Sequence, residues 1–199
     1  HRSPVCRLFE CATLYQKSES DMSYESKSLA IAFYGEGDFY DMKGYIEAIL
    51  KHLGVKGWRI QSDEENPSYH PGRCAKVIIG DKKVGQIHPS VASEFEIGTD
   101  VYAATLDVTK MYGSADSDKH YEPLPVFPGI ERDLALVMDK DIEAQTVIDS
   151  IVRFSGKSLC SVKIFDVYTG KGVPDGKKSV AFRLTFRLPD KTMNDAEAE

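Results

Sequence analysis

Three residues whose side chains can stack on, or hydrogen-bond to, a planar base lie around one glycine-rich turn. Asp166 and Tyr168 lie two residues apart in a β-favouring run, and Ser179 opens the next such run. A tyrosine ring can stack on an unpaired base, while a carboxylate and a hydroxyl can hydrogen-bond to a base edge. The structural alternative is that Asp166 caps the turn and Tyr168 covers the sheet.

Two strands must position these residues. We predict them over 159–168 and 179–188, joined by the turn Thr169-Gly-Lys-Gly-Val-Pro-Asp-Gly176. Residues two apart on a strand share a face, so Asp166 and Tyr168 are expected to point the same way. The same alternation predicts that Phe165 and Val167 point to the buried face, with Phe165 in the core.

Basic side chains around the turn give it a possible phosphate-binding function. Lysines in or beside a turn can pair with phosphates, which makes binding depend on salt, although such a loop is also commonly just solvated. Arg132-Asp133, before the next strand upstream, is expected to form an ion pair rather than an anion site. The candidate phosphate contacts are Lys171, Lys177, Lys178 and Arg183.

The surrounding pattern is β-α-β-β-α, the order of a ferredoxin-like split βαβ domain that lacks its last strand. A strand is predicted over 134–138, then a helix that Asp141 caps and that ends near Gly156. A second helix is expected to open at Thr192.

The first part of the chain reads as an antiparallel α+β module. Strands are predicted over 8–15, 28–33, 58–60 and 101–108, with a hairpin over 74–79 and 84–87 and a helical turn over 91–95. One longer helix should begin at Asp41 as its N-cap and end at Gly54. We therefore expect a module over 1–113, a linker over 114–126 and a second domain over 127–199.

Charge and cysteine usage narrow the function. The net charge of −6 argues against a general nucleic-acid binder, so any RNA contact must be local. Cys74 and Cys160 are expected to be buried thiols. The four cysteines form no C-x-x-C pair and no regular framework, which indicates a reducing cytoplasm. His70 and His88 have no ligand constellation nearby and are interpreted as turn-stabilising; neither a metal site nor a catalytic residue is predicted.

Several short motifs follow one another along the chain in the order in which a known protein family has them. They are Leu8-Phe-Glu10, Phe39-Tyr-Asp-Met-Lys-Gly44, Tyr69-His-Pro-Gly-Arg73 with Gly85-Gln-Ile-His-Pro89, Phe127-Pro-Gly-Ile-Glu-Arg-Asp-Leu-Ala-Leu136 and Ile164-Phe-Asp-Val-Tyr-Thr-Gly170. In this order and spacing the chain resembles the C-terminal part of the bacterial phenylalanyl-tRNA synthetase beta chain. The resemblance covers essentially the whole chain.

That resemblance implies a partial, non-catalytic class II synthetase-like module followed by a ferredoxin-fold anticodon-binding domain. It implies anticodon contacts at Asp166, Tyr168 and Ser179, and a structural role for Arg73. The intact enzyme would be an alpha2beta2 heterotetramer that attaches phenylalanine to tRNA-Phe with ATP and Mg2+ at the alpha subunit. This chain is expected to pack against alpha, to need no cofactor itself, to be inactive alone, and to begin and end inside family elements.

Two other functions are compatible with a ferredoxin-like fold: a small-molecule regulatory domain and a general protein-interaction module. A ligand-binding domain would place its glycines at a helix N-terminus. Here the glycines lie in a hairpin, which favours RNA.

Overall fold

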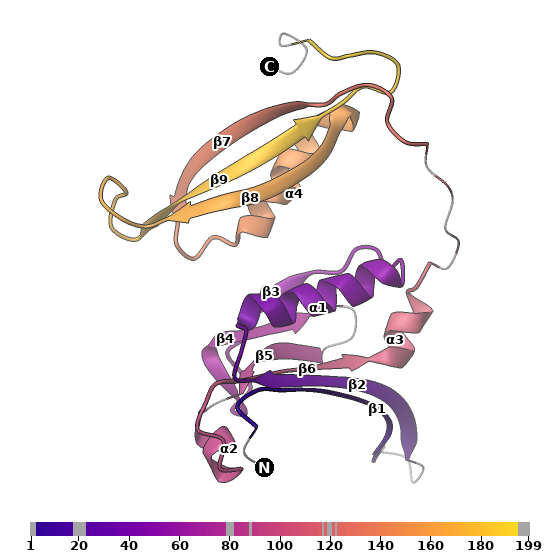
Figure 1. Cartoon of the computed structure of the whole chain (residues 1–199), viewed down its shortest axis with the longest axis vertical. Helices are drawn as coiled ribbons and strands as arrows, with labels where there is room; N and C mark the ends of the chain where they lie inside the picture. Colours follow the sequence, from indigo (N-terminus) through magenta and orange to yellow (C-terminus); the bar gives the residue numbers. More distant parts are fainter. Residues whose placement is uncertain are drawn as a thin grey trace. The chain divides into compact units, whose positions relative to one another are not determined.

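The computed structural model describes residues 3–17, 23–78, 82–87, 89–116, 118, 121 and 123–194, with the backbone alone over 82–87 and 89–90. The chain forms two compact units, His1–His120 and Tyr121–Glu199, each with its own sheet (Figure 1). None of the described helices is long and apolar enough to cross a membrane.

Unit 1 contains a six-stranded antiparallel sheet in the order β1-β2-β6-β5-β4-β3. The predicted strands and the 74–87 hairpin are present, although β1, β2 and β4 are longer than expected and the strand predicted over 58–60 is shifted to 60–62. The bounds are β1 Cys6–Gln16, β2 Tyr24–Tyr34, β3 Ile60–Ser62, β4 Tyr69–Val77, β5 Lys82–Ile87 and β6 Val101–Asp107.

The helix α1 (Phe39–His52) packs on one face of this sheet through Met42, Ile46 and Leu50, which are fully buried. Its N-cap is Asp38, not the predicted Asp41. Asp38 Oδ1 accepts the Tyr40 and Asp41 N–H groups, and Asp41 Oδ2 accepts the Asp38 N–H at 2.8 Å. Asp41 is therefore the third residue of a capping box.

The ends of the other elements follow from local caps and packing. Gly54 follows the C-cap of α1 with a φ of +67°, as predicted for a C′ glycine. The single tryptophan, Trp58, packs against the core of unit 1. The short helix α2 spans Pro89–Glu94. Strand β6 ends at Asp107, which caps a helix the sequence did not predict, α3 (Val108–Gly113).

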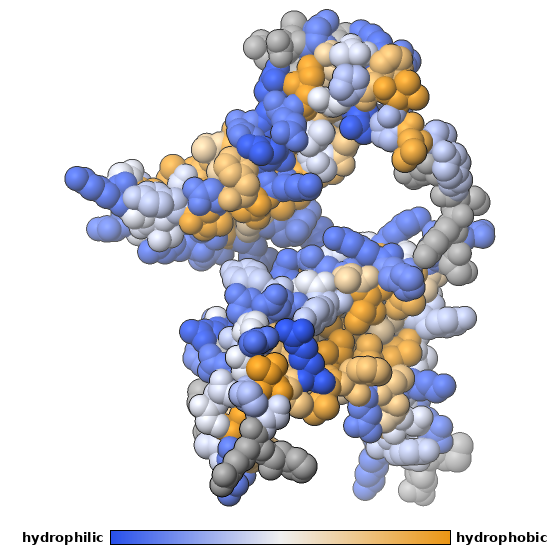
Figure 2. Space-filling model, viewed as in Figure 1, coloured by the Kyte–Doolittle hydropathy of each residue, from blue (hydrophilic) through white to orange (hydrophobic). Residues whose placement is uncertain are grey.

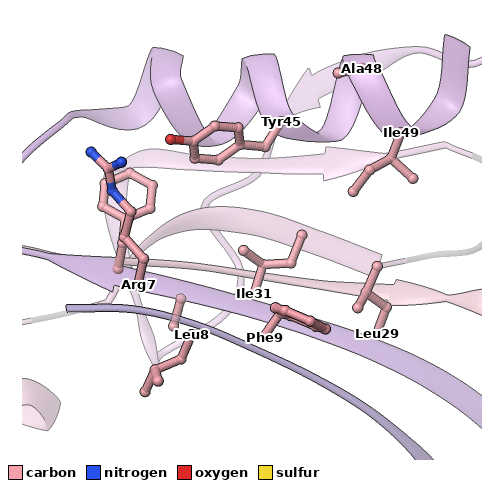
Figure 3. A pocket seen from close by; sticks show the side chains of 10 residues that line it. Arg7, Leu8, Phe9, Leu29, Ile31, Tyr45, Ala48 and Ile49 are labelled. Atoms are coloured by element: carbon pink, nitrogen blue, oxygen red, sulfur yellow. The ribbon is translucent and has the colours of Figure 1, made fainter. Parts of the chain in front are cut away.

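Unit 1 carries an apolar groove of about 550 Å³ between α1 and the strands β1 and β2 (Figure 3). Phe9 stands at its side with 79% of its surface exposed, and Tyr45 and Ile49 line it from α1. Apolar side chains gather in this region of the unit in the space-filling view (Figure 2). The groove is thus apolar surface that the described residues leave uncovered.

Unit 2 contains a three-stranded antiparallel sheet in the order β7-β9-β8, with one helix on one face. This is the predicted split βαβ arrangement, in which the second strand of the hairpin, β9, lies between the other two. The elements are β7 Ile130–Asp139, α4 Ala144–Phe154, a 3-10 turn Gly156–Ser158, β8 Leu159–Tyr168 and β9 Lys177–Phe186.

The core of unit 2 lies between α4 and the alternate residues Val180, Phe182 and Leu184 of β9. Because side chains alternate along a strand, Ser179, Ala181, Arg183 and Thr185 lie on the opposite face. This second face is called the open face below, because no described helix covers it (Figure 1).

Several boundaries in unit 2 differ from expectation, among them those of β9, which spans Lys177–Phe186 rather than the predicted 179–188. Strand β7 begins at Ile130, so Arg132 and Asp133 lie inside the strand rather than before it. The helix begins after Glu143, not at Asp141, because residues 139–142 form a turn in which the Ile142 N–H bonds the Asp139 carbonyl. Residues 192–194 are not helical, and the rest of the predicted second helix lies outside the described residues.

Candidate nucleic-acid interface

Asp166, Tyr168 and Ser179 lie together on the open face of unit 2. In the antiparallel pair β8–β9, Tyr168 stands directly opposite Ser179, and Asp166 directly opposite Ala181. Residues directly opposite each other share a face of the sheet. The register therefore brings an aromatic ring, a carboxylate and a hydroxyl to one end of the open face.

The Tyr168 ring is held against the turn that follows it. Its hydroxyl donates to the Lys171 carbonyl at 3.3 Å, and 47% of the residue remains exposed. The ring lies so close to Gly170 that a Cβ there would stand 2.5 Å from Tyr168 Cζ and 2.9 Å from Cε2. A glycine at position 170 is what allows the ring to take this place.

The carboxylate of Asp166 is exposed and makes no hydrogen bond or ion pair within the described part of the chain. The turn after β8 is closed instead by backbone bonds, from Val173 N–H to the Gly170 carbonyl and from Lys177 N–H to the Pro174 carbonyl. Asp166 thus keeps its acceptor oxygens available to a ligand.

The prediction that Phe165 is a core residue is wrong. Strand β8 has a bulge between Ile164 and Asp166, so Phe165 is an extra residue with no partner of its own on β9. The bulge interrupts the alternation, and Phe165 is 51% exposed. Val167, also predicted to be buried, stands opposite the core residue Val180 yet is exposed, because the described helix does not cover it.

A second bulge explains another incorrect prediction. Cys160 lies at a register shift between Leu159 and Ser161 and is exposed, not buried. Cys74 is buried as predicted, and both cysteines are free thiols.

Arg183 occupies the middle of the open face. Its Nε and Nη2 atoms each donate to a carboxylate oxygen of Asp133 at 2.8 Å, and its guanidinium carbon lies 4.9 Å from the centre of the Phe165 ring. The hydrogen bonds from Arg183 hold the pKa of Asp133 below its usual value, and the same pair raises the pKa of Arg183. The ion pair expected at Arg132-Asp133 therefore forms between Asp133 and Arg183.

The three lysines in or beside the turn differ in their surroundings. Lys177 Nζ pairs with Asp139 at 2.7 Å. Lys178 Nζ donates to the carbonyls of Lys140 and Ile142, which ties the turn to the loop before α4. Lys171 is exposed at the tip, and its ammonium group has no partner among the described residues.

Unit 1 offers weaker candidates. His70 Nδ1 accepts the Gly72 N–H at 3.1 Å within the irregular first part of β4, so His70 bonds to the local backbone of a strand rather than of a turn. Arg73 pairs with Asp100 at 3.7 Å, and its structural role stays a prediction. His88 lies outside the described residues. Within the described ranges no three His, Cys, Asp or Glu side chains are grouped so that they could hold a metal ion.

A three-stranded antiparallel sheet in split βαβ order, with one helix on one face, is the arrangement of a ferredoxin-like domain. The protein-family model described as ferredoxin-fold anticodon binding domain matches residues 125–199. The family model described as phenylalanyl tRNA synthetase beta chain CLM domain matches residues 1–108. The chain belongs to the phenylalanyl-tRNA synthetase beta chain family, and unit 2 is its anticodon-binding domain.

Curated relatives agree with this assignment. The chain is 36% identical over 196 residues to the phenylalanine–tRNA ligase beta subunit of Clostridium tetani, covering 96% of this chain and 25% of that protein. It is 34% identical to the Clostridium acetobutylicum subunit, covering 100% of this chain and 26% of that protein. It is 39% identical to the Moorella thermoacetica subunit, covering 82% of this chain and 21% of that protein. The chain thus spans about a quarter of the length of these relatives.

Proposed function

We propose that unit 2 binds the anticodon of tRNA-Phe on its open face, around Tyr168. The observation that carries the proposal is the shared face of Tyr168, Asp166 and Ser179, with the Tyr168 ring lying against Gly170 and its hydroxyl bonded to the Lys171 carbonyl. Tyr168 stacks on an anticodon base, Asp166 accepts hydrogen bonds from the base edge, and Ser179 donates or accepts beside them. The carboxylate of Asp166 can accept hydrogen bonds from the edge of a guanine. Guanine is the first anticodon base expected for this tRNA.

Phosphate contacts have a secondary part in this proposal. Lys171 is the best placed of the four candidates, because its ammonium group is unpaired within the described residues. Lys177, Lys178 and Arg183 are engaged with Asp139, with two carbonyl groups and with Asp133. Each would have to exchange or share these partners to contact a phosphate.

The test is binding of the chain to the anticodon stem-loop of tRNA-Phe, followed by fluorescence anisotropy at fixed salt. Loss of one stacked base costs about 1–3 kcal/mol, so Tyr168→Ala should weaken binding by about 5- to 150-fold. Tyr121→Ala is the matched control, because Tyr121 is also exposed but lies outside the sheet. A loop with a changed anticodon should bind as weakly as Tyr168→Ala.

Equal binding to stem-loops of any sequence would show that the chain binds RNA through its phosphates and does not recognise the anticodon. Absence of binding by a folded wild-type chain would refute anticodon reading by this chain.

We propose further that unit 1 is the non-catalytic synthetase-like module and packs against the catalytic alpha subunit. The apolar groove between α1 and the strands β1 and β2 supports protein contact, since it exposes Phe9 on an edge strand. In the intact alpha2beta2 ligase, a cytoplasmic enzyme, ATP and Mg2+ would serve aminoacylation on alpha, and this chain alone would be inactive.

This second proposal predicts that Phe9→Asp weakens association with the alpha subunit in sedimentation velocity. Phe95→Asp is the control, because Phe95 is similarly exposed and does not line the groove. If both variants associate with alpha as the wild type does, the groove is not the contact.

A further inference from the structure

A second aromatic residue shares the open face with the proposed anticodon site. The bulge in β8 places Phe165 next to Asp166, and the Arg183 guanidinium lies over the Phe165 ring. A guanidinium within about 6 Å of a ring centre is attracted by the ring electrons. Phe165 and Arg183 therefore form one layered unit on this face.

The layer is fixed by the neighbouring strand β7, on the same face of the sheet. Arg183 stands directly opposite Asp133 in the β7–β9 register, and two parallel N–H···O bonds of 2.8 Å join their side chains. Such a two-point pair fixes the plane of the guanidinium as well as its position. Glu131, at 3.8 Å from Arg183 Nε, adds a second carboxylate on the same side.

This arrangement makes Arg183 a poor phosphate binder and a good stacking surface. Its charge is already shared with two carboxylates, which would repel a phosphate. Its flat group and the exposed part of the Phe165 ring have the shape that unpaired bases stack upon, since bases stack on aromatic rings and on guanidinium planes.

We propose that Phe165 and Arg183, held by Asp133, form a second stacking platform for an unpaired RNA base that neighbours the base read at Tyr168. The inference rests on the proposed anticodon binding. Phe165 and Tyr168 are three residues apart on one strand, about 10 Å along it, so two bases of one loop can reach both positions.

The experiment uses the whole chain and anticodon stem-loops that carry 2-aminopurine at one loop position at a time, because stacking quenches its fluorescence. In the wild type, binding should quench two loop positions. Phe165→Leu and Arg183→Lys should restore the fluorescence of one position, leave the other quenched, and weaken binding about fivefold or more. Arg183→Lys keeps the charge and removes the flat two-point group. Tyr168→Ala should restore the other position.

Three results would overturn the inference, and they differ in what they say about anticodon reading. If Phe165→Leu and Arg183→Lys behave as the wild type while Tyr168→Ala loses binding, the platform fails and the Tyr168 site stands. If Arg183→Ala weakens all loops equally and lowers the salt dependence, Arg183 is a phosphate contact. If the folded wild type binds no stem-loop, the platform and the anticodon site both fail.

A measurement of thermal stability distinguishes RNA stacking from a purely structural role of Phe165 and Arg183. If the role is purely structural, Asp133→Asn and Phe165→Leu would lower the melting temperature of unit 2 and leave the quenching pattern of the bound loop unchanged. That result would also overturn the inference.

Discussion

Gly170→Ala should weaken RNA binding by acting on Tyr168 rather than on RNA. A Cβ at position 170 would stand 2.5 Å from Tyr168 Cζ and 2.9 Å from Cε2, closer than real Cβ contacts allow. The ring is the mobile partner because it is partly exposed and tied only by the 3.3 Å bond from its hydroxyl. Gly170 does not have the left-handed backbone that alanine resists, so the turn itself should survive.

The size of the effect follows from what the displaced ring contributes. If the ring leaves its position entirely, the loss equals that of one stacked base, about 1–3 kcal/mol or about 5- to 150-fold in the dissociation constant. The melting temperature of unit 2 should change little, since the ring is not part of the core around Phe182.

A double-mutant cycle with stem-loop binding as the readout tests this reasoning. Gly170→Ala should cost nothing further when Tyr168 is already alanine, because both changes remove the same contact. Additive losses in the double variant would refute the reasoning and indicate that residue 170 contacts RNA itself. Tyr168→Phe, which removes only the hydroxyl, should fall between the wild type and Gly170→Ala.

Three further predictions concern charge and helix capping. The pKa of Asp133 is lowered by Arg183, so this pair stabilises unit 2 above the unfolded pKa near 4 and its contribution is lost as the pH falls below that value. Asp133→Asn should therefore make the melting temperature of unit 2, followed by circular dichroism, fall less between neutral and acidic pH than it does in the wild type. An equal fall in both proteins would show that the Asp133–Arg183 pair does not contribute to this pH dependence. Asp38→Ala should lower the unfolding free energy of unit 1 by about 0.5–2 kcal/mol in urea, because Asp38 caps α1 with two N–H bonds, and Asp41→Ala should cost less. Lys171→Ala should make the slope of log K against log salt shallower by about 0.7 if it contacts one phosphate, and an unchanged slope would exclude that contact.

Much of unit 2 was accessible from its sequence. The glycines and proline of 169–176 interrupt two apolar β-favouring runs, so the hairpin and the exact span of β8 could be predicted. The shared face of Asp166 and Tyr168 followed from the two-residue period of a strand. The two are paired with Ala181 and Ser179 on the open face.

The incorrect burial predictions arise because strand pairing, which is not local in the sequence, decides which face a residue occupies. A bulge shifts the side-chain pattern by one residue without any mark in composition, and this displaced both Phe165 and Cys160 from their predicted burial. Lys178 reaches carbonyls 36 and 38 residues away, a contact that only the folded chain brings about.

The start of α1 was mispredicted for a different reason, which is local. Asp38 and Asp41 are both suitable N-caps, and the sequence pattern does not decide between them. In the structure they act together, each accepting a backbone N–H of the other. The 114–126 linker remains a prediction.

The packing of Trp58 has a practical consequence for spectroscopy. It is the single tryptophan of the chain and packs against the core of unit 1, whereas Tyr168 is the only tyrosine between residues 122 and 199. Tryptophan emission should therefore report the unfolding of unit 1 alone. The intact chain carries its own optical label for one unit, so the stability of that unit can be followed without separating the two.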